Sequence, residues 1–383
     1  MRSSTPDGRS FAAFVALVLV AMLASSPLAL APVRATAVLV RMASGAAPTG
    51  LLGAVTYEVD ERESELAIEG GKTRMRLYSP RGARGAPGLV VVHGVHRLGV
   101  DEPRLQAFSR AIASVGVTVL APHVAELADY RVDARSVATI GAAAAALARE
   151  TGRARVGVMG LSFAGGLALL AAADPAVRER IAFVVSVGGH HDLARVLRYF
   201  ATSEAPTPDG VWKLHAHDYG VLVLAYRYVE DFFAGGDVEI ARDALRIWLW
   251  GDKPASEARA AAMSPAGRAE MQRFYDKRQD LLADELIATA DRHREAMGPV
   301  SPRTRLGDVR VPVFLLHGEL DDVIPSSEAR WVAHDLPPET PRELLVTPAM
   351  RHVELVGVPT TAQKLALVRF MSGVIAAAFD EPR

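Results

Sequence analysis

The sequence predicts an α/β protein with a mostly parallel central sheet, helices on both faces of that sheet, and a helical cap insertion. Two observations support this fold class. Short apolar runs rich in β-branched residues alternate with segments of helical periodicity from about residue 70 to 190, and the alternation resumes after about residue 305. Between these stretches the pattern is helical only. We therefore expect the outer stretches to share one sheet and the middle stretch to form a separate unit.

Five strands are expected in the first stretch. Residues 73–79 alternate between apolar and polar side chains, as in a strand with one solvated face. The other four are continuous apolar runs, typical of strands buried on both faces of a parallel sheet: 88–94, 117–123, 155–160 and 181–189. Helical patterns connect them at 101–116, 131–150 and 164–174. Because the joints are short, right-handed crossovers should place these helices on both faces of the sheet.

The middle stretch is too long to be a simple crossover. It has helical patterns at 221–233, 239–250 and 269–297 and no evident buried strand. A crossover needs only about a dozen residues, so we expect a cap over the carboxyl edge of the sheet. Its aromatic residues are interpreted first as the core of this cap: Trp212, Tyr226, Tyr228, Phe232, Trp248 and Trp250. After it, strands are expected at 311–318 and 342–348, and helices near 326–336 and within 360–379.

Composition and charge exclude several classes of function. The 383 residues include 43 basic and 44 acidic ones, so no overall positive field would attract nucleic acid or an anionic membrane. The chain has no cysteine, which excludes disulfides, thiolate nucleophiles and cysteine metal sites. No cofactor is expected, and the oligomeric state is left open.

The N-terminal residues have the layout of an export signal. Arg2 and Arg9 precede the apolar run 11–24, and small residues follow. Residues 11–31 are also about long enough to span a bilayer as a membrane tether. We therefore expect the protein to be exported or membrane-anchored, facing outside the cytoplasm, in the bacterial periplasm or cell envelope.

The cleavage point of this signal is left open. Pro32 directly follows the best small-x-small site, Ala29 to Ala31, so cleavage after Ala37 and no cleavage at all are both compatible with the sequence. Residues 41–54 are small and suggest a linker. We expect a signal or membrane-anchor segment with its linker at 1–44 and the first part of the core at 45–190. The cap insertion is expected at 191–305 and the second part of the core at 306–383.

Polar side chains follow three of the expected strands at the edge where open α/β sheets bind ligands. Ser162 follows the strand at 155–160, in the stretch RVGVMGLSFAGG, with small residues on both sides. Asp321 follows the strand at 311–318, and His352 follows the strand at 342–348. A hydroxyl, a carboxylate and an imidazole should thus meet at one edge.

Four motifs carry a resemblance to a known family. GLSFAG (160–165) resembles the nucleophile elbow Gly-x-Ser-x-Gly, with Ala164 in place of the last glycine. HGELDDVIP (317–325) resembles an acid-bearing segment, RHVEL (351–355) a histidine loop, and VVVHGVH (90–96) an oxyanion-side loop. With these motifs in this order, the chain is similar to the α/β-hydrolases over about 70–190 and 305–380.

The resemblance implies a serine hydrolase with the triad Ser162, His352 and Asp321. Neutral His352 would take the proton of Ser162, and Asp321 would fix the imidazole tautomer. The backbone N–H groups of Val95 and Phe163 would form the oxyanion hole. The expected reaction is hydrolysis of a small-molecule carboxylic ester through an acyl-enzyme. An acyltransferase on the same triad and a non-catalytic binding protein of this fold stay open.

Several of these residues have a second interpretation. Ser162 could be only a helix N-cap, and Asp322 rather than Asp321 could be the acid. His93 and His317 each precede a glycine at a strand end and are expected to be structural, whereas His96 could line the oxyanion loop.

Two histidine pairs suggest a metal site only weakly. His190 and His191 precede Asp192, and His215 and His217 lie in the insertion. A metal site needs three or four converging ligands, and the spacing specifies no convergence. We therefore expect no metal, although a metal-dependent hydrolase stays open, and His190 and His191 could instead shape the pocket.

Overall fold

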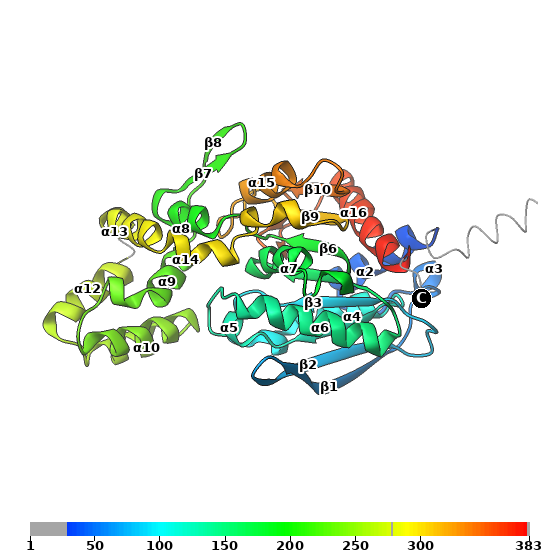
Figure 1. The fold of residues 1–383 in the computed structure, drawn as a ribbon, viewed down its shortest axis with the longest axis horizontal. Coiled ribbons are helices and arrows are strands. Elements are labelled where there is room, and N and C mark those ends of the chain that lie inside the picture. The colour runs from blue at the N-terminus through cyan, green and yellow to red at the C-terminus, as the bar shows by residue number, and fades with distance from the viewer. Residues whose placement is uncertain (1–28, 277–278, 381–383) are drawn as a thin grey trace, which may run out of the picture.

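The computed structural model describes residues 29–276 and 279–380, and its centre is an eight-stranded sheet (Figure 1). The strand order is β1-β2-β4-β3-β5-β6-β9-β10. β2 pairs antiparallel with β1 and β4, and the remaining neighbours are parallel. The strands are β1 (Val59–Ile68), β2 (Gly71–Pro80), β3 (Gly88–Val92), β4 (Thr118–Pro122), β5 (Val156–Leu161), β6 (Ile181–Val187), β9 (Val313–Gly318) and β10 (Arg342–Thr347).

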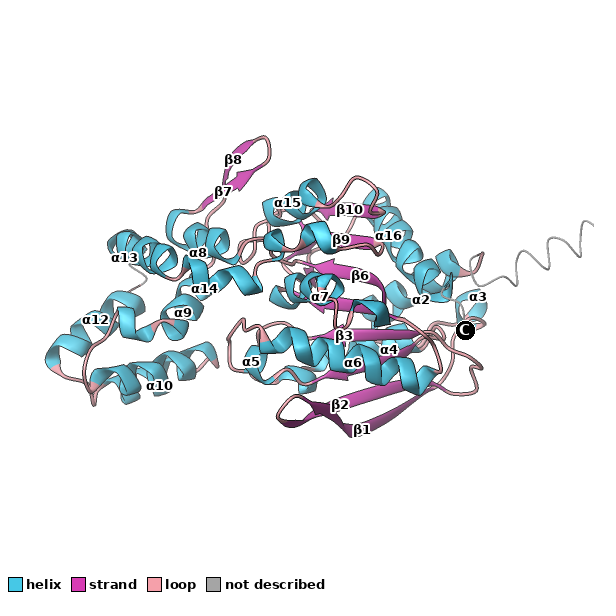
Figure 2. Ribbon diagram, in the orientation of Figure 1, coloured by secondary structure: helices cyan, strands magenta, loops and turns pink. Residues whose placement is uncertain are grey.

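Helices lie on both faces of this sheet, which confirms the predicted fold class (Figure 2). All residues of β3, β4 and β6 are buried, as their continuous apolar runs predicted. Successive residues of a strand point to opposite faces. Val90 and Val92 of β3 accordingly belong to one apolar core, and Leu89 and Val91 belong to another.

These two cores define two faces of the sheet. On the α6/α7 face lie α6 (Arg135–Thr151) and α7 (Phe163–Ala173), together with helices of the insertion. On the α4/α16 face lie α4 (Pro103–Ala113), α16 (Thr361–Asp380) and α2 (Ala31–Ser44). Within the described residues, α16 is the one helix long and apolar enough to cross a membrane by length and composition. Its apolar residues Phe370, Val374 and Ile375 are buried in the α4/α16 core.

The chain between β6 and β9 extends beyond one end of the sheet, to the left in Figure 1. Its described residues form a small hairpin of two strands and seven α-helices: α8 (Leu193–Thr202), β7 (Glu204–Thr207), β8 (Gly210–Lys213), α9 (Asp218–Arg227), α10 (Asp237–Leu249), α11 (Lys253–Ala260), α12 (Pro265–Tyr275), α13 (Gln279–Arg292) and α14 (Arg294–Met297). The hairpin was not expected from the sequence. Tyr226 is buried in this unit, but Trp212 and Trp250 are 40% and 44% exposed, so their assignment to the cap core was wrong.

The segment expected to be a linker at 41–54 is partly helical, and that expectation was wrong. α2 continues to Ser44, and a short helix, α3, covers Gly50–Gly53. α2 packs on α16 and α4 because Ala31, Ala35 and Val38 form a buried stripe at helical spacing. The segment has the composition of a linker because residues 43–47 are all small. Residues 11–28 of the expected membrane tether lie outside the described residues.

Candidate active site

Ser162 lies at a sharp corner between the end of β5 and the start of α7. Its backbone has φ 56° and ψ −136°, a conformation that side-chain-bearing residues rarely adopt. Its N–H donates to the carbonyl oxygen of Val187 at 2.8 Å, which ties the corner to the end of β6. The Ser162 side chain makes no capping hydrogen bond to α7, so the alternative reading of this residue as an N-cap does not hold.

The small residues around Ser162 allow the strand, the helix and a neighbouring loop to approach closely. A Cβ on Gly160 would lie 2.1 Å from the carbonyl oxygen of Ala164. A Cβ on Gly165 would lie 2.4 Å from Oγ of Ser186. Larger residues at either glycine would push the helix away from the sheet and move the serine.

The structure brings together the three residues expected to form a triad. Oγ of Ser162 lies 2.9 Å from Nε2 of His352, and Nδ1 of His352 lies 2.9 Å from Oδ2 of Asp321. Ser162 is 4% exposed, and Asp321 is fully buried. His352 sits on the hairpin of β11 (Met350–Arg351) and β12 (Glu354–Leu355), with φ 51°.

The carboxylate of Asp321 is held ionised by its surroundings. Burial alone would raise its pKa, but the charge and hydrogen bond of His352 and a hydrogen bond from His317 hold the pKa well below its usual range. Nε2 of His317 lies 3.2 Å from Oδ2, and Oδ1 accepts the N–H groups of Val323 and Ile324. His317, expected to be structural, therefore supports the acid.

The ionised carboxylate fixes the tautomer of His352. A carboxylate can only accept hydrogen bonds, so Nδ1 must carry the proton and donate it to Asp321. Nε2 is then an acceptor, and Ser162 donates its hydroxyl proton to it. The neighbouring carboxylate, Asp322, accepts a hydrogen bond from Arg351 instead. Of the two aspartates, the geometry therefore favours Asp321 as the partner of His352.

The loop after β3 lies directly against the nucleophile. A Cβ on Gly94 would lie 2.9 Å from Cβ of Ser162, so only glycine fits there. The expected oxyanion-hole residues Val95 and Phe163 follow Gly94 and Ser162 in the chain. Among the described residues, the N–H of Val95, in the loop, has no acceptor, and the N–H of Phe163, the first residue of α7, has none outside its helix and no intrahelical partner. Both are therefore free to donate to a substrate oxygen.

His93 fixes the conformation of this loop. Its Nδ1 lies 2.7 Å from the carbonyl oxygen of Gly94, and its Nε2 accepts the N–H of Val124 at 3.0 Å. Burial lowers the pKa of His93 to about 4, so the ring is neutral at neutral pH and keeps this donor–acceptor pattern. His96 is further along the same loop and lines the cavity described below.

Tyr219 is a site residue that sequence reasoning missed. It lies on α9 in the insertion, and its hydroxyl donates to the carbonyl oxygen of Val95 at 3.3 Å. Tyr219 thus links the insertion to the expected oxyanion loop. Nothing in the sequence around Tyr219 distinguishes it from the other tyrosines of the insertion.

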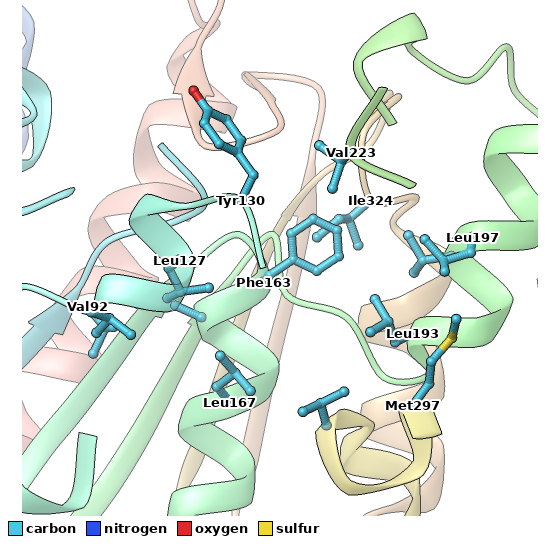
Figure 3. Packing of buried hydrophobic residues seen from close by; sticks show 14 of the residues in the cluster. Val92, Leu127, Tyr130, Phe163, Leu167, Leu193, Leu197, Val223, Met297 and Ile324 are labelled. Atoms are coloured by element: carbon cyan, nitrogen blue, oxygen red, sulfur yellow. The ribbon is translucent and has the colours of Figure 1, made fainter. Parts of the chain in front are cut away.

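The side chain of Phe163 points away from the substrate side. Figure 3 shows its ring beside Ile324 and Val223, within the packing between α7 and the insertion. Its ring centroid lies 5.5 Å from that of His190. The residue therefore anchors the corner through its ring while its N–H stays at the start of α7.

A cavity of about 600 Å³ opens beside Ser162 and His352. Its side nearest the insertion is bordered by Tyr130, Tyr219 and Leu249. Most of its remaining lining is apolar and comes from the α4/α16 face. This volume is within the usual range for a site that takes a small organic ligand.

The histidine pairs do not lie in this cavity. Nε2 of His190 donates to the carbonyl oxygen of Val300, and burial lowers the pKa of His190. Nε2 of His191 lies 2.9 Å from Oδ2 of Asp335. The expectation that His190 and His191 could shape the pocket was therefore wrong, since both join the base of the insertion to the core.

The second pair is part of the start of α9. His217 accepts the N–H of Tyr219 at its Nδ1, and His215 is exposed. Within residues 29–276 and 279–380, no group of three or more histidine, aspartate or glutamate residues is placed to hold a metal ion.

Comparisons with known proteins gave matches to solved structures only. No family model matches the chain, and no curated protein matches it. A puromycin hydrolase is 17% identical over 85% of this chain and 40% of its own, with a TM-score of 0.48. An acylaminoacyl peptidase of Pyrococcus horikoshii is 14% identical over 86% of this chain and 42% of its own, with a TM-score of 0.46. A dienelactone hydrolase from Anabaena variabilis is 15% identical over 83% of this chain and 97% of its own, with a TM-score of 0.43. The chain spans about two fifths of the length of the first two.

Proposed function

We infer from the α/β-hydrolase fold of this chain that it is a serine hydrolase that cleaves carboxylic esters through an acyl-enzyme. The strand–serine–helix corner and the chain order Ser, Asp, His are those of this fold. One observation carries the proposal. Ser162, His352 and Asp321 form a continuous hydrogen-bonded chain with two contacts of 2.9 Å.

Each group has a role in the proposed reaction. His352 takes the hydroxyl proton of Ser162 at Nε2 while Oγ bonds to the ester carbonyl carbon. Asp321 stabilises the imidazolium that forms, and the N–H groups of Val95 and Phe163 bind the oxyanion. When the tetrahedral intermediate collapses, the bond between the former carbonyl carbon and the alkoxy oxygen breaks, and His352 gives its proton to the leaving alcohol. Water then attacks the acyl-enzyme by the same steps and releases the acid.

Hydrolysis of a p-nitrophenyl ester tests this proposal. The variant Ser162→Ala should lower kcat by about 10⁴-fold or more, because the nucleophile is lost while the fold is kept. Ser64→Ala is a matched control, since Ser64 lies exposed on β1 and should leave turnover unchanged. Equal turnover of Ser162→Ala and the parent would contradict the proposal. An added acceptor alcohol, with analysis for a new ester, separates hydrolysis from acyl transfer.

We also propose that the protein works outside the cytoplasm with α2 intact. Arg2, Arg9 and the apolar run 11–24 support export. Cleavage after Ala37 would cut through α2, whose first half is buried against the core. N-terminal sequencing of the mature protein should therefore give a start at or before Ala31, and a start after Ala37 would contradict this proposal.

A further inference from the structure

We propose that the cavity beside Ser162 holds the unbranched acyl chain of a long-chain ester, and that α2 forms the far wall of this acyl pocket. This inference rests on the proposed function, because it specifies the acyl group that the reaction transfers to Ser162.

The floor of the cavity begins at the nucleophile. Leu161 directly precedes Ser162 and lines the cavity, together with Met159 of the same strand. Val187 at the end of β6 and Leu316 in β9 continue the floor. The floor is therefore apolar on the side of Ser162 that belongs to the α4/α16 face.

Two helices form the side walls. α4 contributes Leu105 and Phe108, three positions apart. α16 contributes Leu367, Phe370 and Met371, at spacings of three and four. Residues at these spacings share one face of a helix, so each helix presents an apolar surface to the same space. An alkyl chain is the ligand group that such walls bind best, since it makes no demand for hydrogen bonds.

α2 closes the far side of this space. Its buried stripe of Ala35 and Val38 packs on α16, and the small alanine lets the two helices approach closely. The same stripe continues to Met42, four positions after Val38, and Met42 and Leu39 line the cavity. Leu39 and Met42 thus place apolar side chains of α2 at the space beside α16.

The charged groups are at the mouth of the cavity. Arg104 pairs with Glu102 and with Glu354, and Arg104 and Glu354 have side chains 61% and 57% exposed. Glu354 is on the hairpin that carries His352, so the leaving alcohol departs on this solvated side, next to its proton donor. The apolar interior remains for the acyl chain.

The chain-length dependence of ester hydrolysis measures this pocket. With p-nitrophenyl acetate, butyrate, hexanoate and octanoate, kcat/KM of the parent should rise about fourfold for each added methylene, as expected for transfer of a methylene from water to an apolar site. The variant Met42→Trp fills the far end, so its preference for octanoate over butyrate should fall by at least about tenfold. Met42→Ala should move the optimum toward longer chains.

Val40→Trp is the matched control. Val40 is on the same helix and is exposed to the same 39% as Met42, but does not line the cavity. It should keep the chain-length profile of the parent, which also shows that a tryptophan on α2 is tolerated. If both tryptophan variants give the profile of the parent, α2 is not a wall of the pocket and the inference is overturned.

The outcomes separate this inference from the proposed function. A parent that hydrolyses acetate through Ser162 but gains nothing with chain length keeps the proposed function and overturns the acyl pocket. If n-octyl acetate gains over ethyl acetate while p-nitrophenyl octanoate gains nothing over the acetate, the cavity holds the alcohol side and the acyl assignment is wrong. A parent with no Ser162-dependent ester hydrolysis overturns both.

Discussion

The two faces of the central sheet are covered in different ways. On the α6/α7 face, the insertion shares an apolar core with α6 and α7 and is also held by hydrogen bonds and charges, among them the contacts of Glu328, His190 and Tyr219. On the α4/α16 face, helices pack through apolar side chains around the cavity that reaches Ser162. This difference supports the proposal that contacts on the α6/α7 face position Ser162 and the oxyanion loop, and that the cavity on the α4/α16 face receives the substrate.

Ser162 lies at the boundary of these two regions. The ring of the next residue, Phe163, packs into the α6/α7 face (Figure 3). The preceding residue, Leu161, lines the cavity on the other side. The strained backbone at Ser162 is held from both sides. Substitutions of Asp321, Glu328 and Tyr219 test whether these residues position Ser162, His352 and the oxyanion loop.

The largest expected effect comes from the acid. Asp321→Asn should lower kcat by about 10⁴-fold, because an amide can stabilise the wrong tautomer of His352 and cannot stabilise the imidazolium. Asp322→Asn is the matched control, since Asp322 bonds Arg351 rather than the imidazole, and should cost less than about tenfold. Steady-state kinetics on a p-nitrophenyl ester checks both variants. Reversed sizes would show that Asp322 is the acid.

The next effect concerns the attachment of the insertion. Glu328, at the start of α15 (Ser327–Asp335), is fully buried and accepts the N–H groups of His191 and Asp192 and Nε of Arg195. Glu328→Gln should lower the free energy of unfolding by about 3–5 kcal/mol, because Arg195 loses its buried partner. Glu150→Gln, which breaks an exposed pair with Arg62, should change it by less than about 1 kcal/mol. Denaturant unfolding measures both, and equal losses would contradict this role.

The same carboxylate predicts an acid limit of stability. Burial would raise the pKa of Glu328, but the charge and hydrogen bond of Arg195 and the backbone donors lower it below its ordinary value of 4.5. Its stabilisation is therefore complete above about pH 4.5 and is lost as pH falls through the lower pKa of the folded state. Between the lowered pKa of the folded state and the ordinary value of 4.5, the free energy of unfolding should decrease as pH is lowered, and it should decrease less steeply in Glu328→Gln than in the parent. Identical slopes would contradict the lowered pKa.

The smallest effect tests the link between the insertion and the oxyanion loop. Tyr219→Phe removes the hydrogen bond to Val95 and should lower kcat by about three- to tenfold, as expected for one neutral hydrogen bond, with little change in KM. Tyr226→Phe removes a different bond of the insertion, to Asp129, and should leave kcat within about twofold. Equal kinetics in the two variants would show that Tyr219 has no positioning role.

The parts of this account that were predictable from the sequence depend on strong local patterns. β3, β5, β6 and β9 are almost wholly buried, so their apolar runs identify them, and the ends of β5 and β9 then give the positions of Ser162 and Asp321. β1 was missed because it is an edge strand whose mostly exposed side chains are largely charged, without a buried stripe. The end of α2 was assigned to a linker because residues 43–47 are all small.

The cavity and its supporting contacts could not be predicted in the same way. They depend on which helix faces meet, and α2, α4 and α16 come from both ends of the chain. The hydrogen bond of Tyr219 likewise joins residues 124 positions apart. No local periodicity in the sequence indicates such long-range pairs. The expected triad could be predicted, because each of its members follows a strand that the sequence pattern identifies.

Covalent labelling shows whether Ser162 is an activated nucleophile. The parent, treated with a fluorophosphonate probe and measured by intact mass, should gain the mass of one phosphonyl group, because Ser162 is activated by His352. Ser162→Ala should gain nothing, while Ser64→Ala should be labelled like the parent. A folded parent that stays unlabelled, or labelling that persists in Ser162→Ala, would contradict the assignment of Ser162 as an activated nucleophile.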